Sequence, residues 1–190
     1  MKVLTTPLDK NVINTLKIGD EVYISGYVYI LRDATLRRIF EEKSNLPVEL
    51  KGQVVLFGAP SFIYDKGEYK ILSVGVTTSQ RMEKYIPSLL SLGVKGIIGK
   101  GELSELVTPA FKDKNAVYFL FVGGAAALAT SCIERVEKVW WEDLYGEALF
   151  KVKVNSLGPA FVAIDNMGNN LLLDNKKKVL DNLKKLLQEI

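Results

Sequence analysis

The chain has 190 residues, a formal net charge of +3, 48% hydrophobic and 25% charged residues, values typical of one globular domain. The small, dispersed charge gives no support to nucleic-acid binding, and no apolar run of about 18 residues predicts a transmembrane helix. With no histidine and a single cysteine, Cys132, the chain cannot form a Ser-His-Asp or Cys-His catalytic set, an internal disulfide, or the usual zinc or iron–sulfur ligand sets by itself. We expect a cytoplasmic protein, because the start of the chain lacks the apolar core of a signal peptide.

Helix and strand patterns alternate in the first half of the chain. A short helix is expected from Asp9 to Leu16, followed by an alternating strand from Glu21 to Tyr29. Asp33 can cap a helix that runs to about Lys43. The other elements expected in this half are apolar strands at 53–57 and 69–74 and a helix at 78–91, which Pro87 should kink.

The second half continues the alternation and ends in an amphipathic helix. The expected elements are strands at 96–99, 116–122, 133–140, 148–154 and 160–164, and helices at 102–111, 124–131 and 174–190. Alternation in the middle of the chain favours parallel strand pairing. We therefore divide the chain into a domain at 1–173 and a terminal helix at 174–190. The apolar stripe Leu180, Leu183, Leu187 and Ile190 either packs on its own domain or extends a contact with a partner subunit.

Four junctions between a strand and the following helix carry polar residues or glycines. They are Arg32-Asp33, Thr77-Thr78-Ser79-Gln80-Arg81, Gly99-Lys100-Gly101 and Gly123-Gly124. In open α/β sheets, ligands bind outside the carboxyl ends of strands, and helix N-termini attract anions. Three cations and a hydroxyl-rich helix start at one sheet edge suit a small dianion, since arginine forks bind carboxylates.

Each junction taken alone also has a structural interpretation. Thr77, Thr78 and Ser79 can be helix caps. Arg32 and Arg81 can be surface ion-pair residues. The glycines can serve only turns or tight packing. The case for a site therefore depends on the four junctions together.

A nucleotide site is disfavoured. Around Lys100, Val94 stands where a Walker loop has its first glycine, and Gly101 replaces the Ser or Thr that holds magnesium. No G-x-G-x-x-G motif follows a strand either.

Six segments match one family in order and spacing over roughly residues 3 to 172. They are Leu16–Gly26, Arg32–Ala34, Gly75–Met82, Ile98–Gly101, Val122–Leu128 and Val162–Asp165. On these segments the chain resembles the β subunit, or C-terminal domain, of class I fumarate hydratases and L-tartrate dehydratases. The resemblance implies an α/β fold of the swivelling β/β/α type, with three layers and a central, partly parallel sheet.

The resemblance also implies a partner and a cofactor. In such enzymes the cysteines of an α subunit hold a [4Fe–4S] cluster with one open iron site, and the β subunit closes over the substrate. This chain would bind no metal, and an α2β2-type complex is expected, with no nucleic acid or membrane as partner. The open iron would act as a Lewis acid on the hydroxyl that leaves malate or adds to fumarate.

Residue roles follow from the same resemblance. Thr77 matches the residue proposed as catalytic base, and nearby cations would lower the pKa of its hydroxyl. Arg32, Arg81 and Lys100 match dicarboxylate-binding residues. The substrate-binding set that we expect is Arg32, Asp33, Thr78, Arg81, Lys100 and Gly101.

The chain departs from the family pattern at a few positions. Thr35 and Leu36 stand where the family usually has an alanine and a histidine, and Val76 stands where it usually has a proline. The resemblance implies reversible hydration of fumarate to L-malate together with an α subunit. It leaves open an L-tartrate dehydratase β subunit, or a non-catalytic anion-binding or regulatory domain of the same fold.

Overall fold

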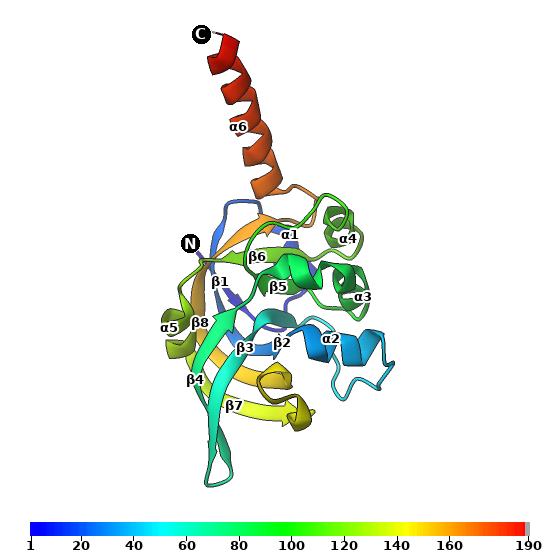
Figure 1. Cartoon of the computed structure of the whole chain (residues 1–190), viewed down its shortest axis with the longest axis vertical. Helices are drawn as coiled ribbons and strands as arrows, with labels where there is room; N and C mark the ends of the chain where they lie inside the picture. Colours follow the sequence, from blue (N-terminus) through cyan, green and yellow to red (C-terminus); the bar gives the residue numbers. More distant parts are fainter. Residues whose placement is uncertain (189–190) are drawn as a thin grey trace.

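A computed structural model describes residues 1–188 of the chain as a mixed α/β structure built on one eight-stranded sheet (Figure 1). The strands are β1 (Lys2–Thr5), β2 (Glu21–Leu31), β3 (Val54–Asp65), β4 (Glu68–Val76), β5 (Gly96–Gly99), β6 (Val117–Phe121), β7 (Ile133–Trp140) and β8 (Leu149–Ile164). The α-helices are α1 (Lys10–Asn14), α2 (Asp33–Phe40), α3 (Ile86–Ser91), α4 (Thr108–Asp113), α5 (Ala126–Ser131) and α6 (Leu171–Gln188). Two 3₁₀ helices, η1 (Ser79–Tyr85) and η2 (Glu142–Glu147), complete the described elements.

The sheet is partly parallel, and its pairing closes on itself. Strands β1, β2, β3, β5 and β6 pair in parallel in that order. Strand β8 then pairs antiparallel with β6 on one side and with β2 on the other, while β7 lies outside β8. The parallel pairing expected for the middle of the chain is therefore confirmed, and β8 joins the two sides of the parallel set.

This topology gives the sheet two different ends. The parallel strands end at Leu31, Gly99 and Phe121, and β4 returns along β3 so that Val76 pairs with Gly58. All four polar junctions therefore follow strand ends at one edge. Strand β8 runs the other way, with Ile164 opposite Tyr118 near the start of β6. Helix α6 consequently leaves the sheet at the opposite edge.

Two apolar clusters hold the elements together. One is formed mainly by the strands of the sheet and α1, with Phe119 and Phe150 among its largest buried side chains. The other lies under α2, η1, α3 and α4, the helices on one side of the sheet in Figure 1, whereas α5 lies on the other side. Leu36, Met82 and Phe111 are fully buried in this second cluster. Burial of these side chains fixes α2 and η1, which begin at the polar edge.

Several boundaries differ from the sequence expectations. The helix expected at 78–91 is the 3₁₀ helix η1 followed by α3, because Pro87 falls in the first turn of α3 and starts a new helix rather than kinking one. The helix expected at 102–111 covers only Thr108–Asp113, again with a proline in its first turn. The two strands expected at 148–154 and 160–164 are one long strand, β8, whose pairing with β2 is irregular near Gly26.

Helix α6 projects away from the rest of the molecule (Figure 1). It begins at Leu171 rather than Asp174, where the Asn170 side chain accepts hydrogen bonds from the amides of Leu172 and Leu173. None of the described residues of α6 is buried, and Leu180, Leu183 and Leu187 are 49%, 50% and 64% exposed. Ile190, the last position of the expected stripe, lies outside the described residues. The interpretation that this stripe packs on its own domain is wrong for its described positions.

No helix within residues 1–188 combines the length and the apolar character that crossing a bilayer requires.

Candidate functional site

The four junctions meet in two groups at the carboxyl edge of the parallel strands. Arg32, Asp33 and Arg81 form one group through ion pairs. Thr78 and Lys100 form the core of the other through a parallel backbone bridge. The segment from Thr77 to Arg81 belongs to both groups and joins them.

The first group is a chain of alternating charges. Asp33 Oδ2 lies 3.1 Å from Arg32 Nε and 3.3 Å from Arg81 Nη2, so one carboxylate bridges two guanidinium groups. Glu147 Oε1 lies 3.6 Å from Arg32 Nε. The four side chains are between 26% and 55% exposed, with Arg81 the most exposed. Water reaches this cluster, and its guanidinium groups retain donors that can turn toward an added anion.

Glu147 is a residue of this cluster that the sequence did not single out. Its carboxylate accepts a 2.8 Å hydrogen bond from the amide of Ala34, and its carbonyl oxygen accepts one from the Thr35 hydroxyl. Asp33 was expected to cap α2, but it is the first helical residue, and the capping position is Arg32, whose side chain makes no capping bond. The capping carboxylate therefore comes from a residue 113 positions away, which no local pattern reveals.

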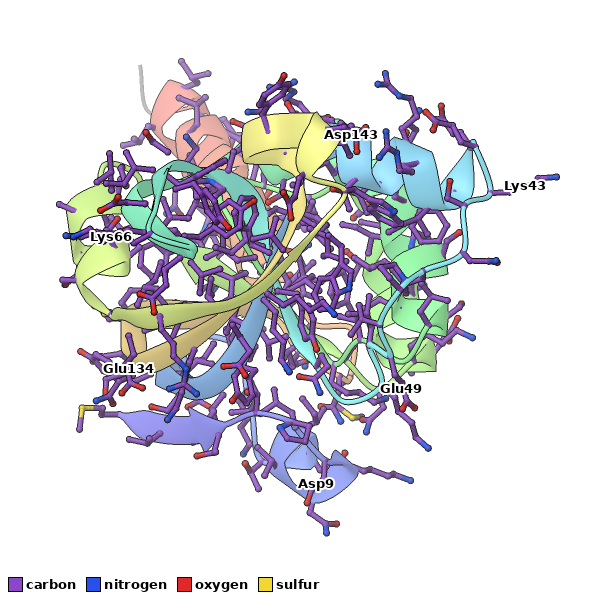
Figure 2. All side chains as sticks on the ribbon, turned by 90° about the horizontal axis from the view of Figure 1, so that it is seen from below. Asp9, Lys43, Glu49, Lys66, Glu134 and Asp143 are labelled. Carbon is purple, nitrogen blue, oxygen red and sulfur yellow. The ribbon has the colours of Figure 1, made fainter. Side chains whose placement is uncertain are left out.

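Further contacts lock α2 against its neighbours. Arg38 makes a bidentate ion pair with Asp143 of η2 at 2.9 and 2.6 Å, and Figure 2 shows Asp143 between η2 and α2. The hydrogen bonds from Arg38 lower the pKa of the Asp143 carboxyl. At the same, C-terminal end of α2, Glu41 accepts hydrogen bonds from Lys84 at 2.8 Å and Tyr85 at 2.6 Å, and its pKa is lowered by these partners. Together with the hydrogen bond from the Ala34 amide to Glu147 at the start of α2, these contacts hold the helix at both ends and set the position of Arg32 relative to η1.

The two threonines lie between the two groups. Thr77 is half-buried, and its amide donates a 2.9 Å hydrogen bond to the carbonyl oxygen of Phe57. Thr78 occupies the N-cap position of η1, but its side chain makes no capping hydrogen bond. The helix-cap interpretation of the Thr78 side chain is therefore wrong.

The second group is the Lys100 loop, which we define as Gly99–Gly101. Its backbone is held by the Ser79 amide, which donates to the Lys100 carbonyl at 3.0 Å, and by the Lys100 amide, which donates to Ser79 Oγ at 3.1 Å. The Tyr118 hydroxyl oxygen lies 3.1 Å from Ser79 Oγ and 3.0 Å from the Gly101 carbonyl oxygen. Burial raises the pKa of Tyr118, which keeps the phenol neutral.

Glycines give the Lys100 side chain its space. A Cβ atom on Gly123 would lie 3.7 Å from Lys100 Cδ, so the lysine stem runs past this glycine at the end of β6. Gly101 has a φ of +85°, a conformation that other residues rarely adopt. Within residues 1–188, Lys100 takes part in no ion pair. The Lys100 ammonium group, carried on a loop whose backbone is held in place, is therefore available to bind an anion.

The chain does not fit an iron–sulfur cluster as a ligand set. Such a cluster is held by several cysteine thiolates, and the sequence has only Cys132. Cys132 is half-buried at the end of α5, and its thiol contacts the carbonyl oxygens of Leu128 and Ser156 at 3.2 and 3.5 Å. In the described part of the chain, no group of three or more metal-ligating side chains is found.

Comparison with known proteins places the chain among hydro-lyase sequences. The family model described as Fumarase C-terminus matches residues 2–174. The Escherichia coli protein named L(+)-tartrate dehydratase subunit beta is 33% identical over 191 residues, which cover 100% of this chain and 95% of that protein. A Methanocaldococcus jannaschii protein named putative L(+)-tartrate dehydratase subunit beta is 33% identical, covering 98% of this chain and 99% of its own length. A Geobacillus stearothermophilus protein named putative fumarate hydratase class I is 34% identical over 95% of this chain but only 35% of its own length.

Proposed function

The chain belongs to the Fumarase C-terminus family, and from this premise we propose that it is the β subunit of an iron–sulfur-dependent hydro-lyase. The reaction is the reversible hydration of fumarate to L-malate, carried out together with a cluster-bearing α subunit. One observation carries the proposal. Three cations, Arg32, Arg81 and Lys100, gather at one sheet edge against two carboxylates, Asp33 and Glu147, so the edge keeps an excess positive charge for a dianion.

In this proposal the cations bind different carboxylates of the substrate. Arg32 and Arg81 bind one carboxylate through their guanidinium donors, and Lys100 binds the other as a point charge. Asp33 holds both arginines in place and can accept a hydrogen bond from a substrate hydroxyl. Thr78 and Gly101 belong to the substrate-binding set through their contact beside Lys100, where a Cβ on Gly101 would lie 3.9 Å from Thr78 Cγ2.

Thr77 is the catalytic base in this proposal. Its support is position: it immediately follows β4 at the carboxyl edge, between the arginine group and the Lys100 loop. A threonine hydroxyl gives up a proton only where nearby cations stabilise the resulting oxyanion. The excess positive charge of this edge supplies that condition.

The cofactor is assigned to the partner. Because this chain has one cysteine, we assign the [4Fe–4S] cluster to the cysteines of the α subunit and derive no step through it here. The resulting complex is of the α2β2 type and cytoplasmic, a compartment that keeps cluster-ligating thiols reduced. The finer fold assignment, a swivelling β/β/α domain of three layers at residues 1–173 with a terminal helix at 174–190, is part of the same proposal.

Two other functions remain testable on the same site. The names of the Escherichia coli and Methanocaldococcus jannaschii relatives favour L-tartrate, a hydroxy-dicarboxylate that the same three cations can bind. A non-catalytic anion-binding domain is favoured by Leu36, which is fully buried in the core where the family usually has a histidine.

One reconstitution separates these functions. The full chain, combined anaerobically with an α subunit carrying an assembled cluster, should hydrate fumarate, whereas the full chain alone should be colourless and inactive. Dehydration of L-tartrate with a higher kcat/KM than hydration of fumarate would assign the tartrate reaction. A cluster-loaded complex that binds these acids without turning them over would identify an anion-binding domain. Turnover by the chain alone would contradict the proposal.

The exposed stripe of α6 suggests a further contact within the complex. We assign Val179, Leu180, Leu183, Leu186 and Leu187, all exposed by 49% or more, to a contact with a partner subunit. Ending the chain after Lys178 removes this stripe and keeps the ion pairs of Lys176 with Glu102 and Lys177 with Glu105. The shortened chain should melt like the full chain but form a smaller or weaker complex by light scattering. A complex of unchanged mass and affinity would exclude the contact.

A further inference from the structure

Ser79 and Tyr118 are buried polar side chains directly behind the Lys100 loop. Ser79 is 0% and Tyr118 1% exposed, so their hydroxyl groups cannot exchange hydrogen bonds with water. They come from different elements, η1 and β6, and both contact the loop that follows β5. Two neighbouring elements, η1 and β6, therefore hold the loop that follows β5.

The hydrogen bonds among these groups have only one consistent direction. The Gly101 carbonyl oxygen can only accept, so the single proton of Tyr118 is donated to it. The Lys100 amide can only donate, and it donates to Ser79 Oγ. The Ser79 hydroxyl is then left to donate to the Tyr118 oxygen. In this arrangement each of these hydroxyl and amide protons has an acceptor. It matches the influences on the Tyr118 pKa, which burial raises and the hydrogen bond from Ser79 lowers.

Packing makes the arrangement specific to this loop. A side chain on Gly99 would overlap Ser79 Oγ, and its Cβ would lie 2.8 Å from the Tyr118 ring and hydroxyl. The glycine therefore allows both side chains to sit against the loop backbone. The loop is fixed at Lys100 N, Lys100 O and Gly101 O, while the Lys100 side chain stays half-exposed and points past Gly123.

We propose that Ser79 and Tyr118 are positioning residues that clamp the Lys100 loop, so that the Lys100 ammonium group is presented to a substrate carboxylate in one orientation. The inference rests on the proposed function for the identity of the substrate. Its structural part, the clamp on the loop, stands on the hydrogen bonds alone. A displacement of about 1 Å at a binding group can lower catalytic efficiency by up to about 100-fold.

Hydrogen exchange on the full chain tests the clamp without any assay of activity. Ser79→Ala removes the acceptor of the Lys100 amide, and Tyr118→Phe removes both the donor to the Gly101 carbonyl and the acceptor of the Ser79 hydroxyl. We expect amide exchange in the Lys100 loop to rise roughly 5- to 50-fold in both variants. Tyr29→Phe is the matched control, because Tyr29 is also buried, at 3% exposure, but lies on β2, which β3 separates from β5, and it should leave exchange in the loop unchanged. Unchanged exchange in both loop variants would overturn the clamp.

Kinetics of the reconstituted complex test positioning. Lys100 would hold a carboxylate equally in the ground and transition states, so Tyr118→Phe should raise KM about 10-fold with kcat little changed. Loss of folded complex would instead lower kcat at constant KM. In a Lys100→Met background, Tyr118→Phe should change kcat/KM by less than about twofold, because its target is already absent. An equal effect in both backgrounds would refute action through Lys100. If the wild-type complex turns over none of these acids, the proposed function fails, and hydrogen exchange still decides the clamp.

Discussion

The Lys100 loop and the arginine cluster lie at the same sheet edge, but different forces hold them. Buried hydroxyl groups fix the Lys100 loop from behind, and water does not reach them. Ion pairs hold Arg32 and Arg81 through Asp33, and these side chains are 26–55% exposed. Exposed ion pairs contribute little to stability and are weakened when salt screens their charges. Salt does not screen buried hydrogen bonds in this way. The edge thus combines one cation on a fixed loop backbone with two cations that can adjust when an anion or a partner subunit arrives.

Thr77 lies where the two halves meet, and its substitution should have the largest effect. Thr77→Val keeps the shape of the side chain but removes its hydroxyl. The backbone hydrogen bond from the residue 77 amide to the Phe57 carbonyl is also kept. If Thr77 is the base, kcat should fall roughly 10²- to 10⁴-fold with KM little changed. Both constants should be measured on the reconstituted complex with cluster content matched to wild type. Thr15→Val, which alters an exposed threonine beside α1, is the control. A stable Thr77→Val complex with most of its kcat would remove Thr77 from the mechanism.

The adjustable half predicts the next largest effect. Arg81→Met should lower kcat/KM, with a loss of about 2–5 kcal/mol of transition-state stabilisation. The reason is that closure over the substrate would bury a substrate carboxylate without its cationic partner. Arg37→Met is a close control, since Arg37 is 59% exposed, similar to Arg81 at 55%, and its one ion pair among residues 1–188 is with Glu42 at 3.7 Å. Equal kcat/KM in the two variants would place Arg81 outside the site.

Alkaline pH tests the rigid half through Tyr118. Burial raises the Tyr118 pKa above its ordinary value of about 10. Above that pH the unfolded chain releases the proton while the folded chain keeps it, so stability is complete below pH 10 and falls as pH rises. Tyr118→Phe should be about 1–2 kcal/mol less stable than wild type near pH 8, through the lost bond to Gly101. The gap should narrow by up to about 1.4 kcal/mol per pH unit above 10.

Urea unfolding between pH 8 and pH 11 measures this gap. Tyr145→Phe, which removes a hydroxyl from a side chain that is 76% exposed, should run parallel to wild type throughout. A Tyr118→Phe curve that also stays parallel to wild type would mean that the phenol is not buried behind the loop in solution.

The sequence predicted the rigid half of this edge better than the adjustable half. Strand β5 and the two glycines around Lys100 were recognised directly, because a short apolar run between glycines leaves few alternatives. Local pattern also placed Thr78 beside a helix start, but it could not reveal that Tyr118 reaches the loop from β6. These contacts depend on which strands become neighbours, and only the closed sheet determines that.

The errors in the adjustable half have the same origin. Asp33 was expected to cap α2 because it precedes an amphipathic pattern, yet Glu147 supplies the capping carboxylate from η2. The helix η2 was not expected at all. Trp141 and Tyr145 adopt positive φ values there, which are rare for these residue types and cannot be predicted from them. Long-range partners and unusual backbone conformations are the features that single-sequence patterns do not encode.

Glu147 gives the smallest effect and the sharpest test of the contrast between the halves. Glu147→Gln keeps an oxygen that can accept from the Ala34 amide, so the change isolates the negative charge at the start of α2 and beside Arg32. We expect a loss of about 0.5–1 kcal/mol in the free energy of unfolding at low salt, measured by urea titration. Glu49→Gln, at an exposed position in the loop after α2 and away from η2 (Figure 2), should cause no comparable loss. Near 0.5 M NaCl the Debye length shortens to about 4 Å, so the Glu147→Gln deficit should largely disappear while the Tyr118→Phe deficit remains. A Glu147→Gln deficit that resists salt as well as the Tyr118→Phe deficit does would mean that both halves of the edge are held by desolvated contacts, and the contrast between them would not hold.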